Sequence, residues 1–355
     1  MARPAIKGIA KIAAPPNSGP MEKRQKPGLE DIARSLGVSK MTVSRVLRGA
    51  SGFSPATRER VLLEVERTGY LPNRLAAAFG PSGTSTLIGV CVPRLTSPLF
   101  GAVLEALNST LARLGYQTMI GAHNQLPEEE EVWLRTLASW KPAGVILASR
   151  LHSKGTLALL RDMAVPVVEI WDLTTKPIDL AVGFSHFDNG LEMARCVTAA
   201  GRRKIGYVGA LGKRNTSGHL RYQGFVRGLA ETGITLANEQ ILEDQPGFYA
   251  GYYGTETMLA RRSDLDAIYY HDDEMAIGGL AYLTRIGVRV PEDMGVAGWG
   301  GMEAASILPR RLTTTAVPTT RLGKVAAEAL VSRLRGAAVD DVTVIQTRLV
   351  PGSTI

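Results

Sequence analysis

The sequence predicts a small all-α headpiece built on a helix-turn-helix, followed by an α/β body of two doubly wound parallel-sheet lobes. Three observations predict this. Two short amphipathic helices with a tight turn between them span residues 29–48, and basic charge is concentrated before residue 81. From residue 87 onward, short apolar strands alternate with amphipathic helices. At 355 residues the chain is long enough for two or three domains.

The helix-turn-helix can be read from the spacing of its apolar residues. In the first helix they fall at i, i+3, i+4 and i+7, on one face: Leu29, Ile32, Ala33 and Leu36. Gly37 tolerates the turn, and Ser39 is expected to cap a second helix over residues 40–47. The inward residues of that helix would be Val43, Val46 and Leu47. The outward residues, where a recognition helix meets base edges and phosphates, are Lys40, Met41, Ser44 and Arg45.

The distribution of charge supports this interpretation. Residues 1–80 hold fourteen Lys and Arg against six Asp and Glu, a surplus that equals the net charge of +8 of the whole chain. The remaining 275 residues hold twenty-seven of each sign. An amphipathic helix pair with a basic face is also an ordinary surface feature. Concentrated positive charge beside it favours DNA binding, because basic side chains near phosphates release condensed counterions.

The rest of the N-terminal region predicts a third helix and a linker. Ser54 followed by Pro55 predicts a helix start, and the helix is expected to end at Gly69. Residues 1–27 form a basic, Pro-containing tail that is expected to be disordered in isolation. Such a tail would add non-specific DNA affinity or do nothing. We therefore expect a tail at 1–27, a helix-turn-helix domain at 28–71, a helix-prone linker at 72–85 and a two-lobed body at 86–355.

The body is predicted from the alternation of strands and helices. Expected strands cover 87–92, 116–122, 144–148, 165–170, 204–208, 267–270 and 295–299. Expected helices cover 99–114, 129–140, 191–200, 220–231, 252–260 and 274–286. These elements are too many for one open sheet, so we expect two lobes with a cleft between them. Ligands of open parallel sheets bind outside the carboxyl ends of the strands.

Composition and motifs exclude several other classes of protein. Cys91 and Cys196 each lie in an apolar run, which suits two buried thiols in a reducing cytosol without a disulfide or metal framework. No window of 18 apolar residues predicts a membrane span, and the N-terminus does not resemble a signal peptide. An enzyme would need a phosphate loop or a nucleophile, and the Gly209–Gly212 segment is only a partial match. We therefore expect no enzyme and no cofactor, and a cytoplasmic, nucleoid-associated protein. A periplasmic sugar-binding protein would share the two lobes but not the headpiece.

A series of motifs along the chain identifies a family resemblance. The series comprises residues 29–48, 54–58, 69–76, 87–90, 201–207, 221–225, 272–278 and 289–293. In this order they resemble the lactose-repressor family of bacterial transcription regulators, whose body is periplasmic-binding-protein-like. Within that family, residues 115–119, 181–184 and 351–353 are most similar to the gluconate-utilisation repressors.

The resemblance implies a homodimer on a pseudo-palindromic, double-stranded operator, with headpieces in successive major grooves and a hinge helix from each subunit in the minor groove. Lys40, Met41 and Arg45 match the base-reading positions. Arg45 can pair bidentately with a guanine, whereas Met41 offers apolar contact to a thymine methyl. The positions that match the family's phosphate contacts are Ser39, Thr42, Ser44, Tyr70 and Asn73.

Phe79 departs from the family pattern, which places a leucine here as a wedge into the central base step. A phenylalanine ring is also apolar, but it is bulkier and planar. It would wedge into the step or stack there. The alternative is that it packs on its twin in the partner subunit or on the body.

The resemblance also implies effector contacts in the cleft. Arg221 matches the sugar-contacting arginine, whose guanidinium can fork onto two oxygens; the alternative is a surface arginine on a helix. Asp272 matches a polar effector contact, and Asp273 is expected to cap the following helix. Adjacent residues point in different directions, so residues 271–274 are not expected to bind a metal.

Three further cleft residues follow from the same comparison. Phe100 and Trp171 would be apolar walls or core residues, and Arg150 is a second possible anion contact. Many sugar-binding members carry an aspartate after the aromatic residue of the strand at 295–299, where this chain has Gly300. A carboxylate at position 300 would repel an acidic ligand, and this chain has none there.

We therefore expect a repressor that a sugar acid such as gluconate, or a derivative of it, releases from its operator. The alternative is a corepressor-dependent regulator that responds to a neutral sugar or another metabolite. Without a heptad-bearing tail, a dimer is expected rather than a tetramer.

Overall fold

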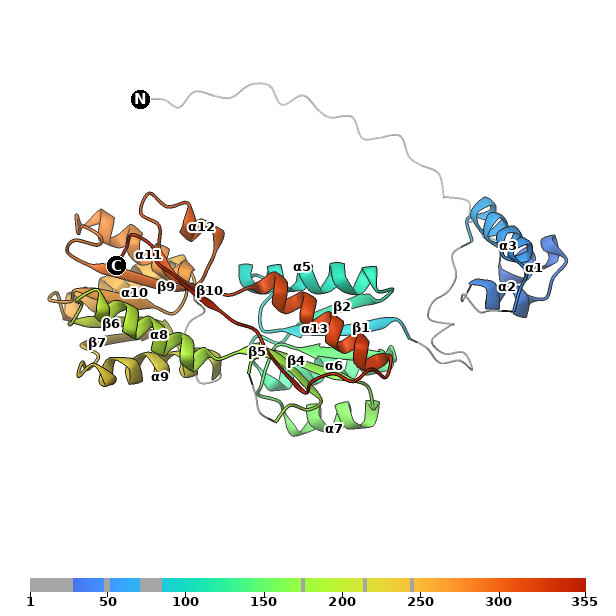
Figure 1. The fold of residues 1–355 in the computed structure, drawn as a ribbon, viewed down its shortest axis with the longest axis horizontal. Helices are drawn as coiled ribbons and strands as arrows, with labels where there is room; N and C mark the ends of the chain where they lie inside the picture. The colour runs from blue at the N-terminus through green and yellow to red at the C-terminus, as the bar shows by residue number, and fades with distance from the viewer. Residues whose placement is uncertain (1–27, 48–51, 71–84, 174–175, 213–215, 243–245) are drawn as a thin grey trace, which may run out of the picture. The chain divides into compact units, whose positions relative to one another are not determined.

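The structure is a computed structural model that describes residues 28–47, 52–70, 85–173, 176–212, 216–242 and 246–355 (Figure 1). The chain divides into two compact units, residues 1–76 and 77–355. The expected hinge helix, Asn73 and Phe79 lie outside the described residues.

The headpiece contains the three predicted helices. They are α1 (Leu29–Leu36), α2 (Lys40–Leu47) and α3 (Pro55–Thr68). Gly37 ends α1 with a left-handed φ of 64°. The hydroxyl of Ser39 accepts a hydrogen bond from the Thr42 backbone N–H at 3.0 Å, so it caps α2 as predicted. The three helices enclose a small apolar core, formed by Ile32, Ala33, Val43, Val46 and Val61.

The first lobe of the body, the N-lobe, is built on a six-stranded sheet in the order β11-β5-β4-β3-β1-β2. Its strands are β1 (Leu87–Val92), β2 (Gln117–Ala122), β3 (Gly144–Leu147), β4 (Val167–Asp172), β5 (Leu180–Phe184) and β11 (Val342–Val344). Two helices, α5 (Pro98–Arg113) and α13 (Thr319–Leu334), pack together over one apolar face. The other face is covered by α6 (Pro127–Ser139) and α7 (Lys154–Met163). The inner strands are therefore buried on both sides.

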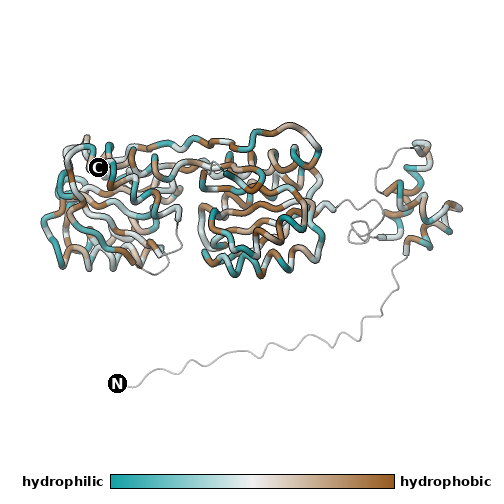
Figure 2. Tube along the Cα trace, turned by 90° about the horizontal axis from the view of Figure 1, so that it is seen from below, coloured by the Kyte–Doolittle hydropathy of each residue, from teal (hydrophilic) through white to brown (hydrophobic). Residues whose placement is uncertain are grey.

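The second lobe, the C-lobe, repeats this plan in the order β12-β10-β9-β8-β6-β7. Its strands are β6 (Ile205–Ala210), β7 (Asn238–Leu242), β8 (Ala267–Tyr270), β9 (Gly295–Gly300), β10 (Thr313–Ala316) and β12 (Arg348–Val350). One face carries α8 (His186–Ala199) and α9 (Thr216–Glu231). The other carries α10 (Phe248–Arg261) and α11 (Asp273–Arg285), and a short α12 (Glu303–Ser306) follows β9. Figure 2 shows the apolar strands inside both lobes.

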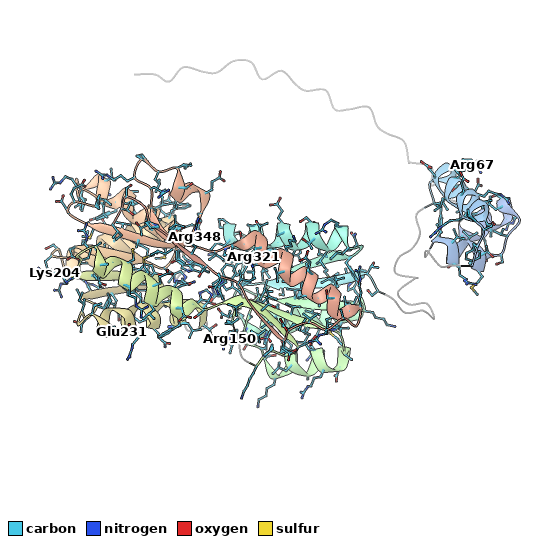
Figure 3. The ribbon with its side chains drawn as sticks, viewed as in Figure 1. Arg67, Arg150, Lys204, Glu231, Arg321 and Arg348 are labelled. Carbon is cyan, nitrogen blue, oxygen red and sulfur yellow. The ribbon has the colours of Figure 1, made fainter. Side chains whose placement is uncertain are left out.

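The chain crosses between the lobes after β5, after β10 and between β11 and β12. As a result, α8 follows an N-lobe strand but packs in the C-lobe, and α13 follows a C-lobe strand but packs on the N-lobe. Arg321 and Arg348, labelled in Figure 3, lie at the beginnings of two of these crossing elements, α13 and β12. The crossings bring the carboxyl ends of β5 and β10 to the junction of the lobes.

The predicted elements of the body are present, and the structure adds several that the sequence analysis did not name. The added elements are α7, α12, α13, β5, β7, β10, β11 and β12. The expected helix at 191–200 begins earlier, at His186. The expected helix at 220–231 begins at Thr216. Both extensions place additional polar residues at the junction of the lobes.

Helices α8 and α9 approach closely because glycines form their contact. A Cβ on Gly190 would lie 2.0 Å from the Arg221 carbonyl oxygen, and a Cβ on Gly224 would lie 1.9 Å from the Phe187 carbonyl oxygen. Neither backbone can yield without moving a helix. This packing fixes the positions of α8 and α9, which both carry residues of the site described below.

A buried ion-pair cluster lies in the N-lobe. His152 Nδ1 is 2.6 Å from Glu130 Oε1, and His152 Nε2 is 3.4 Å from Glu169 Oε1. All three side chains are at most 5% exposed. Burial opposes the charge on the imidazole, but the hydrogen bonds to Glu130 and Glu169 outweigh it and raise the pKa of His152 to about 9.

Replacing Gly224 with alanine should force α8 and α9 apart. We expect Gly224→Ala to lower the free energy of unfolding by about 1–3 kcal/mol, as overpacking does, measured by denaturant unfolding. The matched control is Gly101→Ala, because Gly101 lies in α5 and has open space where its Cβ would be. The control should be neutral, or stabilising by up to about 1 kcal/mol. Equal stabilities of the two variants would contradict the close-packing interpretation.

The stabilisation from His152 should depend on pH. The folded pKa lies above the ordinary value of 6.5, so the contribution is complete below pH 6.5 and is lost as the pH rises through about 9. Wild type should exceed His152→Gln in unfolding free energy by on the order of 2–3 kcal/mol below pH 6.5, with the difference shrinking towards pH 9. Denaturant unfolding at pH 6, 7.5 and 9 measures it. A difference that does not change with pH would show that the imidazole is not charged.

Candidate nucleic-acid interface and ligand cleft

Helix α2 presents the predicted base-reading side chains on its outer face. Lys40, Met41 and Arg45 are exposed, and Met41 is 66% exposed although it is apolar. Val43 and Val46 on the opposite face are buried in the headpiece core. The predicted division of α2 into an inner and an outer face is therefore confirmed.

Exposed contacts within the headpiece orient this face. Lys40 Nζ lies 3.1 Å from Glu30 Oε1, and the Arg45 guanidinium carbon lies 5.1 Å from the centre of the Phe53 ring. Such exposed pairs contribute little to stability, so their cations can exchange partners for phosphates or bases. Among the predicted phosphate contacts, the hydroxyls of Ser39 and Thr42 bond to each other at 2.9 Å. Ser44 is half-buried, and Tyr70 packs against the headpiece core.

A cleft of about 910 Å³, part of it open to solvent, lies between the lobes of the body. Its walls include residues that follow β1, β2, β3 and β8, the ends of β4 and β9, and the first turns of α9. Four of the predicted effector residues line it: Phe100, Trp171, Arg221 and Asp272. The fifth, Arg150, is exposed and is not among the lining residues (Figure 3).

Aromatic rings form the apolar wall of the cleft. The ring centres of Phe100 and Trp171 are 4.5 Å apart, and those of Trp171 and Trp299 are 5.9 Å apart. Phe100 and Trp171 are 8% and 7% exposed, so each is both a core residue and a wall residue. Trp171 has a φ of 86°, a left-handed conformation that is strained for a bulky residue.

Arg221 is the cation at the base of the cleft. It is 2% exposed, so the alternative of a surface arginine is wrong. Its Nη2 donates a hydrogen bond to the His271 carbonyl oxygen at 2.7 Å, and its Nη1 lies 3.0 Å from His186 Nδ1. The guanidinium carbon lies 3.9 Å from the centre of the Trp299 ring. Its Nε–H has no hydrogen-bond partner within the described ranges.

The hydrogen bonds of Arg221 determine the state of His186. Arginine can only donate, so His186 Nδ1 accepts and Nε2 carries the proton. That Nε2 lies 2.9 Å from Asp172 Oδ1. Burial, together with the positive charges of Arg221 and Arg150, lowers the pKa of His186, which keeps the ring neutral. Burial opposes the ionisation of Asp172. The pKa of Asp172 nevertheless lies below its ordinary value, because His186, the hydrogen bond from Ser217 and the charge of Arg150 favour the carboxylate.

Three hydrogen bonds connect the lobes across the cleft, and the longest runs from the Thr216 hydroxyl to Asp172 Oδ2 at 3.5 Å. Ser217, in the first turn of α9, donates to Asp172 Oδ2 at 3.0 Å. Arg94, two residues after β1, donates through Nη1 to the Pro246 carbonyl oxygen at 3.3 Å. Any ligand that enters the cleft therefore meets groups that already hold the lobes together.

The prediction that Asp273 caps α11 is wrong. Asp272, not Asp273, caps α11, because its Oδ1 accepts from the Met275 backbone N–H at 2.9 Å. Asp273 is buried and accepts from the Thr314 hydroxyl at 2.6 Å and from the Met302 backbone N–H at 2.8 Å. Burial raises the pKa of Asp273 to about 6. Asp273 therefore connects the start of α11 to the segments around β9 and β10.

Gly300, the position of the missing carboxylate, lies beside Asp273. Its φ is 132°, and a Cβ there would lie 3.2 Å from Leu99 Cδ1 and 3.6 Å from Asp273 Oδ2. A side chain at this position would be strained and would approach a buried carboxylate. The backbone conformation therefore favours glycine here.

Several residues that line the cleft or support it were not predicted from the sequence. They are Arg94, His123, Asp172, His186, Ser217 and His271. All of them except Ser217 lie at the carboxyl end of a strand or within two residues after it, so the rule for parallel sheets was a usable signal. Among the described residues, no group of three or more His, Cys, Asp or Glu side chains is placed to hold a metal ion. In the same part of the chain, no helix is both long and apolar enough to span a membrane.

Comparisons with known proteins agree with this architecture. Residues 28–73 match the family described as bacterial regulatory proteins, lacI family, and residues 194–355 match a periplasmic binding protein-like domain. The HTH-type transcriptional regulator GntR of Escherichia coli K12 is 34% identical over 89% of this chain and 95% of its own length. The regulator IdnR of the same organism is 30% identical over 86% of this chain and 92% of its own length.

Solved structures show the same fold over nearly the whole chain. A LacI-family transcriptional regulator from Silicibacter pomeroyi is 36% identical, with a TM-score of 0.84 over 92% of this chain and 99% of its own. The lac repressor dimer bound to operator and the anti-inducer ONPF is 26% identical, with a TM-score of 0.83 over 93% of this chain and 99% of its own. The chain therefore belongs to the lacI family of bacterial regulatory proteins and is a DNA-binding transcriptional regulator rather than an enzyme.

Proposed function

We propose that the protein is a repressor that binds a pseudo-palindromic operator as a homodimer, and that a small sugar acid such as gluconate, or a derivative of it, releases it. The observation that carries this proposal is the buried guanidinium of Arg221 in a cleft with an aromatic wall. Arg94 adds a second cation to the lining, and position 300 carries no carboxylate.

The chemistry of the cleft suits a carboxylate attached to a polyhydroxy chain. A carboxylate accepts charge-assisted hydrogen bonds from a guanidinium, and these are stronger than neutral ones. Trp171 and Trp299 offer apolar surface to the C–H groups of the chain. The carboxylates of Asp172 and Asp272 can accept hydrogen bonds from its hydroxyls.

Release from DNA would follow from a change in how the lobes are connected. An effector acts only by binding the DNA-competent and DNA-incompetent states with different affinity. The hydrogen bonds from Ser217 to Asp172 and from Arg94 to Pro246 are the contacts that a ligand would replace or tighten. We infer that occupation of the cleft changes the angle between the lobes and thereby the spacing of the two headpieces in the dimer.

Asp172 and Asp272 also support the alternative of a neutral sugar, because both carboxylates line the cleft and accept hydrogen bonds from hydroxyls. In that case the ligand would act as a corepressor that closes the lobes and tightens operator binding. The sign of the response to acidic and neutral ligands distinguishes the two proposals.

An exposed aromatic patch on α10 is a candidate for the dimer surface. Phe248, Tyr249 and Tyr253 are 47%, 79% and 56% exposed, and the rings of Tyr249 and Tyr253 stack with centres 6.3 Å apart. Contiguous exposed apolar side chains of this kind mark protein interfaces. We propose that a second copy of the chain covers this patch.

Removing the predicted guanine contact should weaken operator binding. We expect Arg45→Ala to lower the affinity for a selected palindromic operator about 10- to 100-fold, and to relax the preference at one base pair in each half-site. Fluorescence anisotropy with labelled duplexes measures both effects. Arg310→Ala, which removes an exposed arginine paired with Glu292 in the body, is the control. If the two variants bind the operator with equal affinity, Arg45 does not contact the DNA.

The effector assignment can be tested on the same duplex by titrating gluconate, 6-phosphogluconate, 2-ketogluconate and glucose. We expect at least one sugar acid to release the DNA and glucose to have no effect. Arg221→Lys should require about 10- to 100-fold more of the active acid, because a lysine cannot replace the fork of the guanidinium. Its operator affinity without effector should match that of the wild type.

Two outcomes would count against the proposal. If the protein binds the operator tightly and none of the four compounds changes the affinity, the sugar-acid assignment is wrong. The assignment as a DNA-binding regulator would be unaffected. Tighter operator binding in the presence of glucose would instead favour the corepressor alternative.

A further inference from the structure

His123 is a buried, unpaired side chain on the wall of the cleft. It directly follows β2, on the N-lobe side, and is 3% exposed. Neither Nδ1 nor Nε2 has a hydrogen-bond partner in the part of the chain that the structure describes. His152 in the nearby ion-pair cluster, by contrast, uses both of its ring nitrogens.

Burying a histidine without hydrogen-bond partners lowers the stability of the folded protein when no ligand is bound. A neutral imidazole carries one donor and one acceptor, and burying either without a partner costs free energy that an apolar side chain would not lose. Unpaired buried groups are uncommon in native proteins and require an explanation. The location of His123 on the cleft wall supplies one, because a ligand there can pair with the ring.

The surroundings of His123 keep its ring neutral. Burial lowers its pKa, and the positive charge of His152 acts in the same direction. Glu130 and Glu129 oppose this shift, but they do not outweigh it. A neutral ring can pair with a hydroxyl group, which both donates and accepts, whichever nitrogen carries the proton.

We propose that His123 is the N-lobe contact of the effector and binds a hydroxyl group of it, while Arg221 in the C-lobe binds the carboxylate. This inference rests on the proposed function and specifies it further. The ligand it describes has an acid group at one end and free hydroxyls towards the other, and it contacts both lobes at once. His123 then makes the affinity depend on the hydroxyl-bearing end of the chain.

The test uses the full-length protein and two readouts, thermal unfolding without ligand and calorimetric titration with gluconate. His123→Leu removes both polar atoms, and His123→Gln keeps a donor and an acceptor. His219→Leu is the control, because His219 lies in α9 and is not among the residues lining the cleft.

We expect the Tm of ligand-free His123→Leu to equal or exceed that of the wild type, because two unpaired polar atoms are removed. Its affinity for gluconate should fall about tenfold or more. His123→Gln should recover most of that affinity, since the hydrogen-bonding groups return. The control should change neither readout.

Two results would overturn the proposal. A ligand-free Tm that drops by several degrees in His123→Leu would show that the ring supports the fold, and gluconate affinity that stays at the wild-type level would show that the ring does not touch the ligand. If wild type binds no gluconate, the sugar-acid assignment falls separately. The unfolding measurement then still decides whether His123 is held for a ligand or for the fold.

Discussion

The burial of Arg221 is the constraint on which the rest of the cleft depends. A guanidinium removed from water must be compensated by partners, and here they are the Trp299 ring, the His271 carbonyl and the imidazole of His186. The protonated Nε2 of this imidazole lies 2.9 Å from Oδ1 of Asp172, which belongs to the other lobe. One buried cation thus determines the proton position on a histidine and connects the two lobes electrostatically. The glycine contacts between α8 and α9 serve the same network, because they fix both helices that carry it.

Patterns that are local in the sequence predicted the local structure well. Helix bounds and caps in the headpiece followed from apolar spacing and from Ser39, Ser54 and the flanking glycines. Six inner strands, β1, β3, β4, β6, β8 and β9, were found because continuous apolar runs indicate burial on both faces, whereas the inner strands β5 and β10 were missed. Helix α13 was missed because its small residues, such as Gly323 and Ala326, weaken the apolar pattern while permitting close packing against α5.

The site was predictable only in part, because its partners come together through tertiary structure. Phe100, Trp171, Arg221 and Asp272 were placed in the cleft by family resemblance, and they line it. His186 and Asp172 were missed, since His186 contacts Arg221, which is far away in the sequence, and Asp172 contacts His186. The cap of α11 was assigned to Asp273 instead of Asp272, because two adjacent acids at a helix start look equivalent until the backbone direction is known. Backbone geometry, rather than composition, decides which of two adjacent aspartates caps a helix.

The crossings between the lobes have a consequence for biosynthesis. The N-lobe begins at β1 but is completed only by α13 and β11, which come from residues 319–344. During translation the headpiece helices emerge first and can fold by themselves, whereas the N-lobe sheet must wait for segments made after nearly all of the C-lobe. A ribosome that stalls in the C-lobe would therefore display a finished DNA-binding module on an unfinished sensor.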